Sequence, residues 1–219
     1  MKEMLIQLGP PISKITYGIE FTSIIILAIL CFLIYTKTSS LEKLTSHHGI
    51  EFFRKAFLFF GITFILSFII LFERLIHFQF FDIRTIMLLI LYFNLVAIGY
   101  LFFSLISNKV KNYELTIFLG ALVVPLLGGL FKERIEFLAG IQVIISFIFL
   151  IILYKKYVQS KESKKSMLVL YFLLLVFWLL SGIGIYISKV LQIERELFPI
   201  IKVLLFAYIW YKIHKRFSQ

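Results

Sequence analysis

Two ionisable residues lie inside long apolar stretches of the sequence, where a charge is costly. Glu20 and Lys202 each fall about five residues after the start of such a stretch, in 15–36 and 197–213. Five residues of α-helix rise about 7–8 Å. We therefore predict that the two residues share a depth, where an ion pair would offset much of the cost of burying either charge. The alternative is that both side chains reach outward to the lipid headgroups.

Three other residues favour the same region of the membrane. Gln142 lies about seven residues into its apolar stretch, while Asn94 and Trp178 lie near the middle of theirs. Together with Glu20 and Lys202 they predict an outward-opening pocket for a small or lipidic ligand. The alternative is structural: interhelical hydrogen bonds worth about 0.6–2 kcal/mol each for the amides, and packing for the tryptophan.

Catalytic and metal-binding patterns are missing from the sequence. It contains no glycine-rich phosphate loop, no G-x-S-x-G elbow and no H-E-x-x-H pair. His47 and His48 are adjacent, so on a helix they point about 100° apart and chelate poorly. The single cysteine, Cys31, lies in an apolar run and favours a buried packing role. We expect a non-enzymatic protein without a metal or cofactor.

Composition indicates the elements that must position these residues. Of 219 residues, 61% are hydrophobic and only 16% are charged, whereas soluble domains are nearer half apolar and a quarter charged. The excess predicts a polytopic protein of the cell membrane. The net charge of +11 would favour nucleic acid as a partner in a soluble protein, but here the basic residues occupy short gaps between apolar runs.

The apolar runs predict an all-α bundle of seven transmembrane helices that forms one integral membrane domain over 1–219. A spanning helix needs about 20 mostly apolar residues. The expected spans are about 15–36, 53–72, 85–106, 115–131, 135–154, 167–188 and 197–213. The fourth is short and contains Pro125, so a re-entrant hairpin with the fifth is the alternative to a full crossing.

The basic residues predict the orientation of this bundle. Fourteen of the 23 Lys and Arg residues fall in the gaps after the first, third and fifth spans and in the carboxyl-terminal tail, and eight fall on the opposite side. Positive charge is retained in the cytoplasm. The amino terminus is therefore expected outside and the carboxyl terminus inside. The cytoplasmic loop 155–166, KKYVQSKESKKS, reads as a solvated topology signal or as a docking site for a cytoplasmic partner.

Three charged residues mark the entry to the second span from the cytoplasm. Glu51 and Lys55 form an i,i+4 pair of the favourable order, worth about 0.2–0.5 kcal/mol in a water-exposed turn. We predict that this turn lies among the headgroups, and that Arg54 binds a lipid phosphate or a carbonyl.

Three resemblances accompany this plan. Segment 47–61, HHGIEFFRKAFLFFG, resembles a group of uncharacterised seven-span membrane proteins of archaea. The seven-helix plan is similar to the membrane regions of some sensor histidine kinases, which implies signalling through a separate partner. The lysine in the last span also resembles the retinal-binding lysine of microbial rhodopsins. That likeness would place retinal on Lys202, but the third span has no carboxylate and Lys202 lies nearer the outer surface, so we expect no retinal.

The function expected from these features is a sensor or receptor-like module that binds a small or lipidic ligand. The alternatives are a small transporter or channel subunit, in which Glu20 and Lys202 serve the permeation path, and a structural subunit of a membrane complex.

Overall fold

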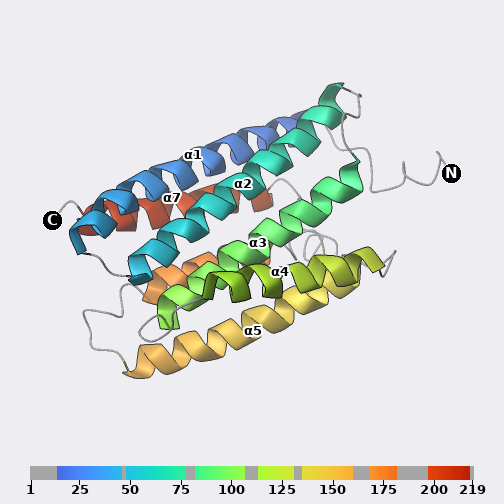
Figure 1. Cartoon of the computed structure of the whole chain (residues 1–219). Helices are drawn as coiled ribbons and strands as arrows, with labels where there is room; N and C mark the ends of the chain where they lie inside the picture. Colours follow the sequence, from blue (N-terminus) through green and yellow to red (C-terminus); the bar gives the residue numbers. More distant parts are fainter. Residues whose placement is uncertain are drawn as a thin grey trace.

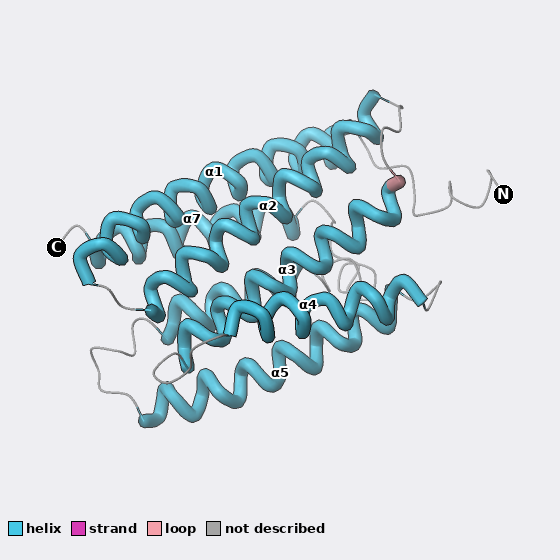
Figure 2. The backbone as a smooth tube through the Cα atoms, viewed as in Figure 1, coloured by secondary structure: helices cyan, strands magenta, loops and turns pink. Residues whose placement is uncertain are grey.

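The computed structural model describes residues 14–45, 48–76, 82–106, 113–130, 135–159, 168–181 and 197–217. Within these ranges every regular element is a helix (Figure 2), which confirms the all-α prediction. The helices are α1 (Lys14–Thr45), α2 (His48–Ile76), α3 (Ile83–Ile106), α4 (Tyr113–Leu130), α5 (Ile135–Gln159) and α7 (Leu197–Phe217). A further helical segment, Leu168–Ser181, is called helix 168–181 below.

Five of the described helices have the length and apolar composition needed to cross a membrane, as expected of a multi-pass membrane protein. These stretches are Thr16–Ser39, Gly49–Ile76, Thr85–Leu105, Gly140–Gln159 and Leu197–Lys215. Two apolar helices are shorter, Glu114–Leu126 and Leu168–Ser181, and they coincide with the predicted fourth and sixth spans. Residues 182–188 of the predicted sixth span lie outside the described residues.

Several helices extend beyond the apolar runs that predicted them. The first helix continues to Thr45 rather than residue 36, and the second occupies His48–Ile76 rather than 53–72. Backbone hydrogen bonding does not need an apolar side chain, so polar residues continue a helix past its hydrocarbon-facing part. At the start of α3, Asp82 acts as the N-cap, because its Oδ2 accepts hydrogen bonds from the Thr85 backbone N–H (3.3 Å) and hydroxyl (2.8 Å).

The bundle is organised around α2, which packs most extensively against α3 and α1. In turn α1 packs against α7, and α3 packs against α4. The start of α1 lies at the right-hand end of the bundle in Figure 1, and the end of α7 lies at the left-hand end. The first and last described helices therefore run in the same direction, side by side, which is the arrangement that the predicted pairing of Glu20 and Lys202 requires.

Small residues allow two of these helix pairs to approach closely. A Cβ atom added at Gly61 of α2 would lie 3.6 Å from the Cβ of Cys31 on α1, which is ordinary contact. A Cβ atom added at Gly99 of α3 would lie only 2.9 Å from the Ile117 Cγ2 of α4. Glycine is thus required at position 99 for α3 and α4 to pack as they do. Cys31 itself is buried, as predicted.

Candidate functional site

Glu20 lies on the face of α1 that points into the bundle. The buried residues of this helix recur every three or four positions, and Glu20 falls in the same series between Thr16 and Ser23. Residues with this spacing share one side of an α-helix. The buried members of the series are Thr16, Ser23, Leu27, Cys31, Ile34 and Thr38. Glu20 is itself half-buried, at the amino-terminal, polar end of the series.

Lys202 occupies the equivalent place on α7. The buried residues of this helix are Phe198, Phe206, Ile209 and Ile213, and Lys202 stands four positions from each of the first two. The lysine therefore lies on the buried side of α7, and its side chain is half-buried. By contrast, Leu204 on the opposite side is 65% exposed, as expected for a lipid-facing residue.

Glu20 and Lys202 lie on neighbouring helices, within range of each other's charge. Helices α1 and α7 are in contact, and the negative charge of Glu20 acts on the Lys202 ammonium group. Each residue lies on the buried face of its helix and within two turns of the amino-terminal end of that helix. An opposite charge nearby offsets part of the cost of holding either charge away from water.

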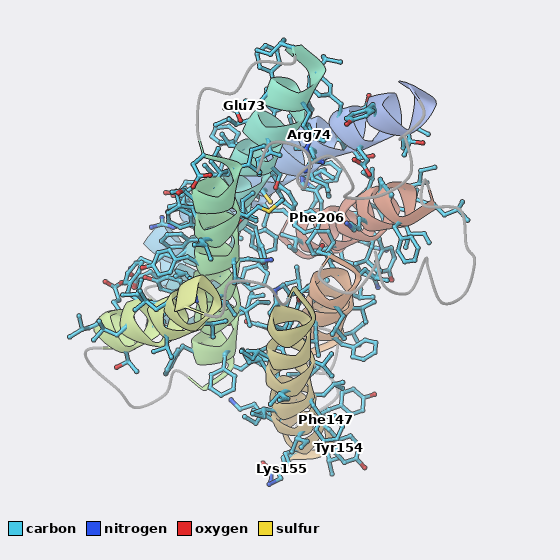
Figure 3. All side chains as sticks on the ribbon, turned by 90° about the vertical axis from the view of Figure 1, so that its right-hand side faces the viewer. Glu73, Arg74, Phe147, Tyr154, Lys155 and Phe206 are labelled. Carbon is cyan, nitrogen blue, oxygen red and sulfur yellow. The ribbon has the colours of Figure 1, made fainter. Side chains whose placement is uncertain are left out.

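A cluster of phenylalanine rings lies directly beyond Lys202 along α7. Phe206 is one turn further along the same face and contacts Phe57 (5.7 Å between ring centroids) and Phe64 (6.2 Å) of α2. It also contacts Phe177 of helix 168–181, at 4.8 Å. All four side chains are buried, and Figure 3 shows Phe206 pointing from α7 toward the neighbouring helices. We call these four residues the aromatic floor, since their rings pack together one turn beyond Lys202 along α7.

Gln142 and Trp178 form a second group. The side-chain Nε2 of Gln142 on α5 donates a hydrogen bond of 2.7 Å to the backbone carbonyl of Trp178 on helix 168–181. Both side chains are buried, and the Ser146 hydroxyl donates to the Gln142 carbonyl at 2.7 Å. Gln142 thus ties two helices together. Trp178 follows Phe177 of the aromatic floor in the chain.

Asn94 is the predicted site residue that stands apart. It is half-buried in the middle of α3, whose main neighbours are α2 and α4. The five predicted residues therefore form a charged pair on α1 and α7, an amide-to-backbone contact between α5 and helix 168–181, and an amide on α3.

A buried carboxyl group that the sequence analysis did not select lies in the carboxyl-terminal turn of α2. Glu73 is only 2% exposed. It falls on the same side of α2 as Phe52 and Phe59, whose rings contact Tyr100 of α3. Glu73 thus faces the α3 side of the bundle rather than the Glu20–Lys202 pair. One sequence feature could have identified Glu73 as buried. It lies three residues after the apolar Ile70, and residues with this spacing share one side of a helix.

At the opposite end of the bundle, the predicted Glu51–Lys55 pair is confirmed, with Nζ to Oε1 at 2.6 Å. Lys55 makes a second ion pair with Glu114 in the first turn of α4, which links α2 to α4. The neighbouring Arg54 bonds to a hydroxyl within the protein, because its Nη1 donates to Ser39 Oγ at 3.1 Å. Its guanidinium group also lies 5.3 Å from the centre of the Tyr35 ring.

No group of three or more His, Cys, Asp or Glu side chains in the described ranges has the arrangement of a metal site. At the end of the bundle where α1 and α7 begin, the structure thus places one carboxylate, one ammonium group and a cluster of aromatic rings on neighbouring helices.

Comparison with known proteins identifies an archaeal relative of this chain. A protein of Archaeoglobus fulgidus, described as an uncharacterized protein, is 31% identical over an aligned region that covers 78% of this chain and 80% of the relative. No family model matches the sequence. No solved structure matches it either. This identity extends over most of both chains, so the protein belongs to the same family as the Archaeoglobus fulgidus protein.

Proposed function

We propose that the protein is a non-enzymatic, receptor-like module of the cell membrane that binds a small or lipidic ligand in its outer half. The observation that carries this proposal is the position of Glu20 and Lys202, on the buried faces of two helices in contact. Ionisable residues inside membrane spans are costly to maintain and usually serve ligands, ions or protons.

The pair of opposite charges favours a ligand with a matching pair. A zwitterionic group would place its ammonium against the Glu20 carboxylate and its anionic part against Lys202. Each charge of the protein would then exchange one partner for another of the same sign, so neither would be left unpaired on binding. This exchange is the reason to expect reversible binding at the site rather than a purely structural ion pair.

The aromatic floor favours a receptor over the transporter alternative. A permeation path through the charged pair would have to continue past Phe206, whose side chain is fully buried against Phe64 and Phe177. In a receptor the floor instead completes the bottom of the site. The signal would then pass to a separate cytoplasmic partner through movement of α7.

The proposal includes seven crossings with the amino terminus outside, and this topology can be tested with reporter fusions. A reporter that is active only in the cytoplasm, fused after Gln219, should give a signal because the tail is rich in Lys and Arg. The same reporter fused after Glu133, between the fourth and fifth spans, should be silent. Activity at Glu133 together with silence at Gln219 would show that the orientation is the reverse of the one proposed. Activity at both positions would show that one of the proposed crossings between them is missing.

Access to the outer half tests the binding site itself. The test variant carries Glu20→Cys and Lys202→Met, so that no lone charge remains, together with Cys31→Ala. A membrane-impermeant methanethiosulfonate reagent, added to intact cells, should modify this cysteine because thiols react as thiolates, which need water. A matched variant with Ile25→Cys, on the exposed apolar side of α1, should resist modification. Equal resistance of both cysteines would contradict an outward-opening site.

A further inference from the structure

An apolar groove lies between α3, α4 and α5, away from the charged pair. Its volume is about 270 Å³, which at about 30 Å³ per water-sized group holds roughly nine such groups. The lining side chains are almost all apolar, with Thr116 at one end and Val124 at the other end of the α4 wall. A polar headgroup would find few partners there, whereas a stretch of hydrocarbon chain fits both the size and the lining.

The groove opens to the surface that faces lipid. Gly120 on its α4 wall is exposed, and a Cβ atom added there would meet no atom within 4 Å. Ile148 on its α5 wall is 50% exposed. Helices α4 and α5 share only a narrow contact, so their facing sides are left apart. A lipid chain can therefore enter sideways from the bilayer.

A basic residue stands in line with the groove on α5. Lys155 follows Ile148 by seven residues, which is two turns on the same side of the helix and about 10 Å along it. It is exposed, and Figure 3 shows it at the edge of the bundle, on the other side of α5 from Phe147 and Tyr154. Its ammonium group lies toward the end of the bundle where α5 ends and α4 begins, at the level expected for headgroups.

We propose that this groove is a binding site for an anionic phospholipid of the membrane. One hydrocarbon chain of the lipid occupies the space between α3, α4 and α5, and its phosphate pairs with Lys155. The apolar lining selects the chain, and the lysine selects the negative charge, because juxtamembrane Lys and Arg attract anionic headgroups. With the amino terminus outside, this lipid belongs to the cytoplasmic leaflet.

The lipid should stabilise the folded protein by mass action. The full chain is purified in detergent, and its Tm is measured with added dioleoyl phosphatidylglycerol or dioleoyl phosphatidylcholine. Phosphatidylglycerol at tenfold excess over its Kd should raise the Tm by about 3–5 °C. Phosphatidylcholine should give a clearly smaller shift at the same concentration. Equal shifts from the two lipids in the wild-type protein would overturn selection for an anionic lipid.

Substitutions separate the two parts of the proposed site. Gly120→Trp places a ring in the groove and should abolish the shift, whereas Gly18→Trp, at an equally open and exposed glycine of α1, should keep it. Lys155→Gln should reduce the shift with phosphatidylglycerol to that with phosphatidylcholine. If Gly120→Trp does not fold, Ile148→Trp fills the groove from the α5 side. A full phosphatidylglycerol shift in the groove-filling variant that folds would overturn the proposal.

Discussion

Replacing Glu20 by glutamine, or Lys202 by methionine, should destabilise the protein more than replacing both together. Each single change leaves the remaining charge on the buried face of its helix without the opposite charge that acts on it. Removing one partner of a well-buried pair costs about 3–5 kcal/mol. The loss here should fall toward the lower end, because both side chains are half-buried. The double variant removes both charges and should recover much of the folded yield.

The measurement is the monodisperse, folded fraction in detergent for the two single variants and the double variant. Lys215→Met, at an exposed position near the end of α7, serves as the control for loss of a positive charge and should leave the yield unchanged. Losses that simply add in the double variant would show that the two residues do not interact. Such additivity would also remove the main support for a binding site in the outer half.

Much of the helical framework could be predicted from composition, since the apolar runs were long enough to identify each helix. Helix ends were less predictable. The second helix begins at His48, five residues before its apolar run, and its polar first turns are held by the Glu51–Lys55 pair and by bonds from Arg54 and Lys55 to neighbouring helices. The i,i+4 pair of Glu51 and Lys55 was readable from spacing alone. The Lys55–Glu114 contact was not, because it joins residues 59 positions apart.

Sequence spacing predicted the relative position of Glu20 and Lys202 better than that of the other site residues. Equal distance from the helix starts was enough to suggest a shared depth for Glu20 and Lys202. Nothing in the sequence indicated that the Gln142 side chain would bond to the backbone of Trp178, since backbone groups carry no signal of their own. Asn94 was selected for depth alone, and depth does not say which side of α3 a residue occupies.

The aromatic floor leads to the second prediction with a large expected effect. Phe206 is fully buried and packs against rings from α2 and helix 168–181. Phe206→Ala should lower the free energy of unfolding by about 3–5 kcal/mol, because the removed ring leaves a cavity that rigid neighbours only partly fill. Leu204→Ala, two positions away on the exposed side, should cost far less. Thermal unfolding of the two variants in the same detergent measures the difference.

The same variant distinguishes a receptor from a transporter. If Glu20 and Lys202 served a permeation path, removing the Phe206 ring would widen its narrowest part, and liposomes containing Phe206→Ala would leak protons or small cations faster than those with Leu204→Ala. For a receptor, the cavity below the pair leads only into the packed rings of Phe57, Phe64 and Phe177, which still close the bundle. We therefore expect equal, background flux from both variants. Faster flux through Phe206→Ala, at matched protein content, would favour transport and contradict the receptor.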